Sequence, residues 1–274
     1  MFWVVQHNLY NEYGYESLLS TLVKYNIPHA IVKPVPFFDR LLPADFDSHE
    51  YKGSIDALTG AVIDESGLIM CCGSLTLARI AHQRGWKPGH FNNENFTFEK
   101  WRQAWGENLL NFDAIVTTVG KVTPIWNEFF IRPVEDTKSF SGMVVTWDEW
   151  SKWINGVLEL NDCWNVKNDT GVMFCPLKKI YTETRFFVVD GKLITWSEYK
   201  LGVEVHYSRK MVSQNVIDYA QKMVDIWQPS RAFVIDIAET PEGMKVVEIN
   251  CFNSAGFYDC DVAKIVEAVE GMEY

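Results

Sequence analysis

The chain has 274 residues, of which 47% are hydrophobic and 22% are charged, and its formal net charge is −11. This composition is typical of a globular protein with one large or two small domains, and the absence of a basic cluster argues against nucleic acid as a partner. No apolar run reaches the ~18–20 residues of a membrane-spanning helix and no signal peptide is visible, so we expect a cytoplasmic protein that does not bind membranes.

The first 95 residues are predicted to form an α/β unit. Strands are expected at residues 2–5, 30–32 and 68–72, with helices at 15–25 and from after Ser74 through His82. Strands that alternate with helices favour a small parallel sheet. Gly73 and Ser74 follow the third strand, where they either cap the next helix or present free backbone N–H groups to an anion.

The pattern changes to α+β after about residue 96. The expected elements in this part are helices at 98–110, 148–158, 209–227 and 261–270, strands at 128–132 and 143–145, and hairpins beyond 171. We therefore expect two domains, 1–95 and 96–274, the second divided into subdomains of about 96–170 and 171–274.

A basic residue closes the strand at 128–132. Arg132 follows three apolar residues and precedes Pro133 and a polar loop that contains Lys138. A cation at the end of a strand, before such a loop, can contact a phosphate. A turn that merely contains Arg132 explains the pattern equally well.

A second hairpin is predicted around Asp190 and Gly191, which form a two-residue turn signal between apolar strands. This turn pairs Arg185 with Trp196, and Glu183 with Glu198. One sheet face then carries four charged side chains, namely Glu183, Arg185, Glu198 and Lys200. Such a cluster can hold phosphates and ribose hydroxyls, or it is a surface ladder of ion pairs that contribute little.

The third hairpin carries a candidate metal site. Asp236 is the one polar residue in the apolar strand 233–238, and a turn at 240–243 leads into a strand with Glu248 and Asn250. Side chains alternate along a strand, so Glu248 and Asn250 share a face, and Asp236 lies opposite Val247 or Glu248. Two carboxylates and an amide oxygen on one face suit Mg²⁺ bound to nucleotide phosphates. Alternatively, Asp236 meets a lysine or arginine on a polar face.

In this order, the three features resemble the ATP-grasp superfamily: a strand-loop-strand lid with a cation, a hinge strand, a Glu-x-Arg hairpin, then Asp…Glu-x-Asn. The resemblance covers about residues 129–258. Phe-Ile-Arg-Pro together with Glu-Ile-Asn-Cys-Phe-Asn-Ser-Ala-Gly-Phe-Tyr is most similar to a compact clade named for its paired arginines and a lysine, often found in bacteriophage genomes.

The resemblance implies a fold and a site. The fold is α+β: an ATP-grasp domain at 96–274, with a lid subdomain and a metal and substrate subdomain, preceded by a small α/β domain at 1–95. The implied Mg²⁺ ligands are Asp236, Glu248 and Asn250, with Arg132 and Lys138 on the phosphates of ATP. Adenine and ribose would lie against Met173, Cys175, Leu177 and Glu183. The implied catalytic residues are Arg185 and Lys200, and those at the acceptor pocket are Asn253, Ser254 and Tyr258.

The implied activity is that of an ATP- and Mg²⁺-dependent ligase that joins a carboxylate to an amine through an acyl-phosphate. Its substrates would be small molecules or peptides, in the host cytoplasm if the chain is viral. Two alternatives are an ATP-dependent small-molecule kinase and a nucleotide-binding or host-interaction module of low turnover. Neither the identity of the substrates nor the oligomeric state follows from the sequence.

Overall fold

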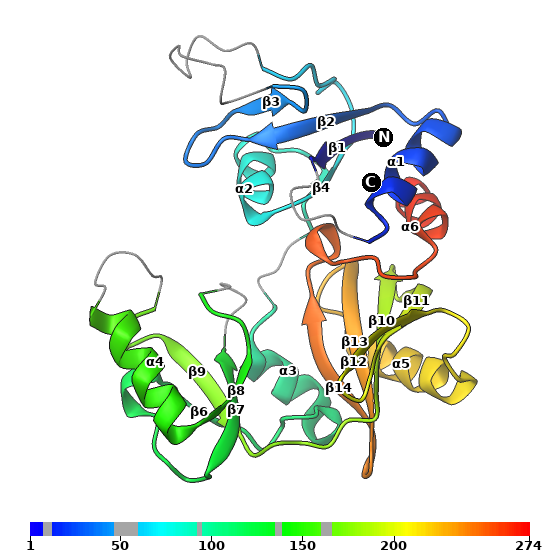
Figure 1. Cartoon of the computed structure of the whole chain (residues 1–274). Helices are drawn as coiled ribbons and strands as arrows, with labels where there is room; N and C mark the ends of the chain where they lie inside the picture. Colours follow the sequence, from blue (N-terminus) through cyan, green and yellow to red (C-terminus); the bar gives the residue numbers. More distant parts are fainter. Residues whose placement is uncertain (8–12, 47–59, 92–94, 135–138, 160–165) are drawn as a thin grey trace.

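The computed structural model describes residues 1–7, 13–46, 60–91, 95–134, 139–159 and 166–274 (Figure 1). Within these ranges the strands form three sheets. In Figure 1 the sheet of the first residues lies at the top, and the other two lie side by side below it. Lys138, predicted to contact phosphate, lies outside the described residues.

The front sheet has the strand order β3-β2-β1-β4-β5. Its strands are β1 (Phe2–Gln6), β2 (His29–Pro34), β3 (Leu41–Pro43), β4 (Ile69–Cys72) and β5 (Pro88–Gly89). The pairings of β1 with β2 and β4, and of β4 with β5, are parallel as predicted, whereas β3 pairs with β2 antiparallel. The short β3 and β5 were not predicted. Helices α1 (Tyr15–Lys24) and α2 (Leu75–Gln83) bury apolar residues against neighbouring elements.

The second sheet, which we call the lid sheet, has the order β6-β9-β7-β8. Its strands are β6 (Ile115–Thr118), β7 (Glu128–Pro133), β8 (Met143–Thr146) and β9 (Gly171–Cys175). Helix α4 (Trp147–Glu159) covers the sheet with Trp150, Ile154 and Val157, whose spacing places them on one helical face.

The third sheet, which we call the central sheet, has the order β12-β11-β10-β13-β14. Its strands are β10 (Thr182–Val189), β11 (Lys192–Leu201), β12 (Glu204–Ser208), β13 (Ala232–Thr240) and β14 (Gly243–Asn250). Alternate residues of β10 face two different cores: Phe186 packs with α3 (Phe98–Trp105) and α5 (Gln214–Ile226), and Phe187 packs with the front of the chain.

Helix α6 (Val262–Glu270), the last helix in the sequence given, packs against the first residues of the chain. Val262 and Ile265 share a core with Leu18 and Leu22 of α1. Glu270 accepts hydrogen bonds from the Met1 ammonium group at 2.8 Å and from Trp3 Nε1 at 2.6 Å. The two ends of the chain therefore lie close together (Figure 1), and α6 completes the packing of the front sheet. The division into two domains at residue 95 stays a prediction.

For two helices, one predicted boundary was wrong. The helix expected at 98–110 ends at Trp105, because Gly106 adopts a positive φ of 51° with ψ of −128°, which breaks the helix, and begins a 3-10 turn (Gly106–Asn108). The helix expected to begin near residue 209 begins at Gln214, because the Ser213 side chain caps it by accepting the Val216 N–H.

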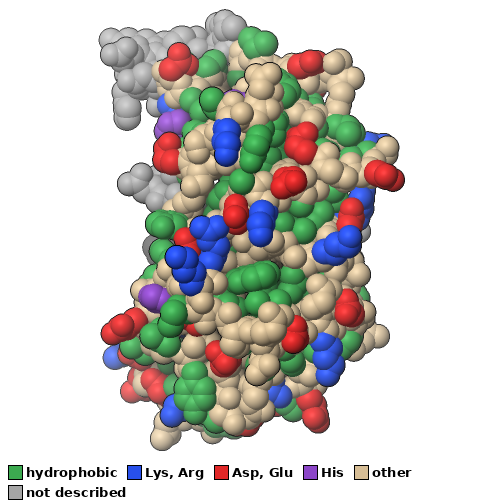
Figure 2. Space-filling model, turned by 90° about the vertical axis from the view of Figure 1, so that its right-hand side faces the viewer, with side chains coloured by type: hydrophobic (Ala, Val, Ile, Leu, Met, Phe, Trp, Pro, Cys, Tyr) green, Lys and Arg blue, Asp and Glu red, His purple; other side chains and the backbone are tan. Residues whose placement is uncertain are grey.

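The face of the molecule in Figure 2 shows acidic and basic side chains interspersed rather than separated by sign. In the described segments, none of the helices combines the length with the apolar character that a membrane span requires.

We expect Asp261→Ala to lower the free energy of unfolding by about 1 kcal/mol, because Asp261 is the cap of α6 and its Oδ1 accepts the Lys264 N–H. Urea denaturation of the variant beside the wild type measures the change. Asp261→Asn is the control, since asparagine keeps the acceptor oxygen and is expected to stay near the wild-type value. Equal losses in the two variants would show that the cap is not the cause.

Candidate active site

The hairpin of β13 and β14 brings three predicted metal ligands together. Thr240 pairs with Gly243, so two residues form the turn, and Asp236 pairs with Glu248, one of the two predicted registers. Asn250 Nδ2 donates to Glu248 Oε1 at 3.0 Å and to Asp236 Oδ2 at 3.2 Å. The side chains of all three residues therefore meet on one face.

Asp236 is completely buried and pairs with Arg185 of the neighbouring strand β10. Arg185 Nε donates to Oδ1 at 3.0 Å and Nη2 donates to Oδ2 at 2.8 Å. The alternative that Asp236 meets an arginine therefore holds in this structure. Burial raises the pKa of the Asp236 carboxyl to about 6, although Arg185 opposes that rise. The Arg185 guanidinium is thus already held beside the three oxygen-bearing side chains.

A second ion pair links the lid sheet to β14. Arg132 Nη1 of β7 lies 2.6 Å from Glu248 Oε2, and the guanidinium lies 5.1 Å from the centre of the Trp101 ring of α3. Burial acts to raise the pKa of Glu248, but Arg132 and the hydrogen bond from Asn250 together hold it below its ordinary value. Arg132 therefore bridges the two sheets at the predicted metal face.

A third pair lies on the adjoining part of the central sheet. Lys200 Nζ lies 2.7 Å from Glu183 Oε1, and the Tyr199 hydroxyl donates to Glu183 Oε2 at 2.6 Å. Glu183 and Lys200 are thus brought together, as expected from the second hairpin.

The predicted position of Glu198 on this face was wrong. The strands β10 and β11 contain two register shifts, so Arg185 pairs with Ser197 and Glu183 pairs with Lys200. Glu198 instead lies opposite Thr184, and its carboxylate lies 3.9 Å from His206 Nε2. A β-bulge adds one residue to a strand and thereby moves the following side chains to the other face.

Tyr258 extends the site beyond the ion pairs. Its ring stacks between Tyr199 and Tyr207, with centroid distances of 4.9 Å and 5.0 Å. The Arg185 guanidinium lies 4.7 Å from the centre of the Tyr258 ring. Tyr258 has a φ of 50°, uncommon for a residue with a side chain, and the stacked rings hold it there. The predicted substrate residue Tyr258 therefore contacts a predicted catalytic residue.

Asn253 does not lie where a residue that contacts substrate is expected. Only 1% of the residue is exposed, and its carboxamide bonds to the protein backbone. Oδ1 accepts the Phe91 N–H at 2.9 Å, and Nδ2 donates to the carbonyls of Cys71 at 2.7 Å and Gly89 at 3.2 Å. Asn253 thus ties the 3-10 turn Phe252–Ser254 to the front sheet, while Ser254 beside it is partly exposed.

A cavity of about 820 Å³ opens between the lid sheet and the central sheet. Five of the predicted site residues line it: Arg132, Leu177, Glu183, Lys200 and Glu248. Met173 and Cys175 are buried within β9 and do not line it, because the chain turns toward the cavity only after the strand ends. The cavity thus has charged groups toward β14, and near Leu177 its lining combines apolar side chains with Lys178 and Lys179.

Sequence analysis missed several of the lining residues. They are Leu110 and Asn111 of the loop before β6, Phe130 of β7, Val144 of β8 and Val247 of β14. The loop reaches the cavity because the Leu110 N–H donates to the Val246 carbonyl at 2.8 Å. A contact between segments so far apart in the chain leaves no periodic signal in the sequence.

The residues at the predicted metal face fit Mg²⁺. In the described parts of the chain no group of three or more His, Cys, Asp or Glu side chains could hold a metal. The set here offers oxygen atoms from two carboxylates and from the carboxamide of Asn250, whose Nδ2 donates to both carboxylates in this structure. Mg²⁺ prefers oxygen ligands and is commonly held by one or two carboxylates together with substrate phosphates. The cavity beside Glu248 has room for such phosphates.

Comparison with known proteins gives a family and a fold. The model of a family of ATP-grasp domains, the third family of one clade, matches residues 81–269, more than half of the chain. D-alanyl-alanine synthetase A from Vibrio cholerae is similar in structure with a TM-score of 0.56 and 13% identity, over 100% of this chain and 95% of that chain. D-cycloserine synthetase DcsG is similar with a TM-score of 0.55 and 11% identity, over 98% of each chain.

A third similar structure is the ATP-grasp ligase PsnB complexed with a minimal precursor, with a TM-score of 0.54 and 12% identity over 98% of this chain and 97% of that chain. At these identities the likeness concerns the fold, an α+β ATP-grasp fold in agreement with the prediction. No protein of curated function matches the chain.

Proposed function

Because the chain belongs to this family of ATP-grasp domains, we propose that it is an ATP- and Mg²⁺-dependent ligase that joins a carboxylate to an amine. One observation carries the proposal: three pairs of opposite charge meet at or beside one cavity between the lid and central sheets. A cavity lined by both apolar and charged side chains suits a nucleoside triphosphate.

The charged end supplies the groups that a transferring phosphoryl group needs. Arg132 approaches from the lid sheet, whereas Arg185 and Lys200 belong to the central sheet. Cations placed in advance around a transferring phosphoryl group stabilise its charge, and most of the catalysis of phosphoryl transfer consists of such positioning. Glu183, held by Tyr199 and Lys200, would accept hydrogen bonds from the ribose.

Asp236, Glu248 and Asn250 would hold Mg²⁺, which neutralises the β- and γ-phosphates when it is bound. Their strand pairing fixes these three side chains relative to one another. Arg185 keeps the buried Asp236 ionised by pairing with it, while Arg132 does the same for Glu248. These pairs hold the oxygen ligands in the charged form that metal binding requires.

The proposed reaction has two steps. A carboxylate oxygen of the substrate attacks the γ-phosphorus of ATP, which gives an acyl-phosphate and ADP. An amine then attacks the acyl carbon, inorganic phosphate leaves, and an amide forms. Tyr258, stacked against Arg185, and the partly exposed Ser254 would border the acceptor.

The substrates would be small molecules or peptides, in the cytoplasm. Two similar structures support this class, since one is named for D-alanyl-alanine synthesis and the other is a ligase complexed with a precursor.

Calorimetric titration of ATP in the presence and absence of Mg²⁺ tests the proposal. Wild type is expected to bind ATP in a Mg²⁺-dependent manner, and Glu248→Gln is expected to weaken that binding by at least about tenfold, the equivalent of one charge-assisted contact. Glu239→Gln is the matched control, because Glu239 lies on the neighbouring strand β13 and bonds Thr182, away from the cavity lining.

Folded wild-type protein that binds no ATP would exclude the proposed ligase. If ATP binds, phosphate release that requires both a carboxylate and an amine supports amide formation. A phosphorylated product that accumulates when no amine is needed would instead identify a kinase.

A further inference from the structure

Asn111 is a nearly buried polar residue in the wall of the cavity. It lies in the loop between the 3-10 turn Gly106–Asn108 and β6, and 8% of it is exposed. Its carbonyl accepts the Ala114 N–H at 2.9 Å, and the Leu110 N–H donates to Val246 at 2.8 Å. The backbone of the loop is therefore fixed, and the Asn111 side chain has a defined place in the cavity lining.

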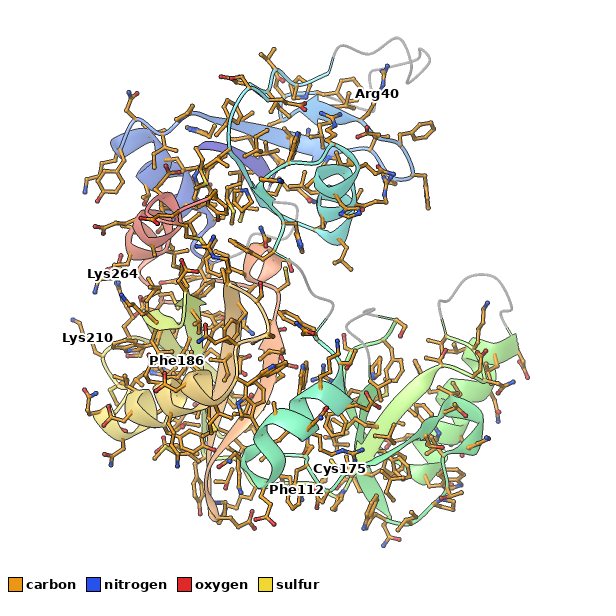
Figure 3. The ribbon with its side chains drawn as sticks, turned by 180° about the vertical axis from the view of Figure 1, so that it is seen from behind. Arg40, Phe112, Cys175, Phe186, Lys210 and Lys264 are labelled. Atoms are coloured by element: carbon orange, nitrogen blue, oxygen red, sulfur yellow. The ribbon has the colours of Figure 1, made fainter. Side chains whose placement is uncertain are left out.

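A thiol orients the carboxamide of Asn111. Cys175 Sγ, at the end of β9, donates to Asn111 Oδ1 at 3.3 Å. Burial raises the pKa of the Cys175 thiol to about 12, so the thiol remains a donor at neutral pH. Figure 3 shows Cys175 and Phe112, the residue next to Asn111, close together where the lid sheet meets α3. With Oδ1 directed at the thiol, the NH₂ group points away from it.

The NH₂ group of Asn111 has no hydrogen-bond partner among the residues that the structure describes, yet it is not sealed from the cavity. Asn111 shares the cavity lining with the apolar residues Leu110, Phe130, Leu177 and Val247 and with the charged Lys178. Because this donor is spare and keeps surface toward the cavity, an acceptor on a bound ligand can pair with it.

We propose that Asn111 is a specificity-determining residue that reads the edge of an adenine base. Nδ2 donates to a ring nitrogen, N1 or N7, and Oδ1, which keeps one free lone pair beside the thiol, accepts from the N6 amino group. Asparagine pairs with adenine in this bidentate manner when proteins read DNA. Guanine carries a carbonyl in place of that amino group and would set two acceptors against each other. The inference rests on the proposed function, which places ATP in this cavity.

Titration of wild type and Asn111→Leu with MgATP, MgGTP and the 1-deaza and 7-deaza analogues of ATP tests the assignment. Leucine keeps the size but removes both hydrogen-bonding groups. We expect ATP binding to weaken about tenfold, the effect of one lost pairing, and the preference of wild type for ATP over GTP to disappear. One deaza analogue should bind wild type about tenfold more weakly than ATP, and bind the variant no differently from ATP.

Asn108→Leu is the matched control, because Asn108 lies in the same segment but donates to the Trp105 carbonyl and does not line the cavity. Cys175→Val, which keeps Asn111 but removes the thiol donor, should reduce the preference for ATP over GTP. If Asn111→Leu does not fold, Cys175→Val and Asn111→Ser are titrated in its place. Unchanged ATP affinity in folded Asn111→Leu, or equal losses for ATP and GTP, would overturn the assignment. A wild-type protein that binds no nucleotide at all would instead overturn the proposed function.

Discussion

Arg185→Met is expected to cost about 3–5 kcal/mol of folding free energy, because it leaves a buried carboxylate without its charged partner. Asp236 is completely buried, and its remaining donor is Asn250 Nδ2 at 3.2 Å. The same variant is expected to lose at least about a thousandfold in ATP turnover, as when an arginine that faces a transferring phosphoryl group is removed.

Urea denaturation and a coupled assay of ADP release measure the two effects of Arg185→Met separately. Arg231→Met is the matched control, since Arg231 also makes a two-point contact with an aspartate, Asp190, but at the exposed surface. An exposed pair contributes only about 0–1 kcal/mol.

The double variant Arg185→Met with Asp236→Asn should recover much of the stability, because no buried charge remains unpaired, but none of the turnover. A single variant as stable as Arg231→Met would contradict the account of the buried pair.

Arg132→Met is expected to lower ATP turnover by about 10²–10³-fold, the usual effect of removing one donor placed for developing charge. Its effect on stability should be small, about 1 kcal/mol or less, because the Arg132–Glu248 pair is partly exposed. The ATP turnover of Arg132→Lys should lie between that of wild type and that of Arg132→Met. Lysine keeps the charge but not the planar fork that contacts Glu248 and lies over Trp101.

The measurements for Arg132 are ATP affinity by calorimetry, ADP release, and protection of the β7 amide hydrogens from exchange. Arg84→Met serves as the control, because Arg84 pairs with Asp39 and Glu65 in the front part of the chain, away from the cavity. ATP affinity and turnover that match wild type in Arg132→Met would remove Arg132 from the site.

The parts of the site that could be predicted depend on local geometry. The alternation of side chains suffices to place Glu248 and Asn250 on one face. The turn at 240–243 alone would pair Asp236 with Val247, and a register shift next to Asp236 brings it opposite Glu248 instead. The same reasoning was wrong for Glu198, because the turn at Asp190 sets the pairing only near the hairpin end and two bulges follow. Bulges depend on packing across the whole sheet and have no reliable signal in a single strand.

For Asn253 and Asn111, the residue type alone does not predict what the side chain contacts. Both are buried asparagines, yet the Asn253 carboxamide is satisfied by three backbone groups, whereas the NH₂ group of Asn111 is left toward a cavity. The difference depends on which distant segments each side chain meets. The end of α3 was predictable in principle, since Gly106 is a glycine, the residue that most readily adopts a positive φ.

The contact between α1 and α6 also affects how the chain folds while it is being synthesised. A ribosome releases the front of the chain first, yet Leu18 and Leu22 are covered in part by Val262 and Ile265, which are synthesised much later. Nascent chains fold largely from the N-terminus as domains appear. Here α1 must keep an apolar helical face uncovered until α6 has been synthesised, and the nascent chain is most exposed to aggregation and to chaperones during that time.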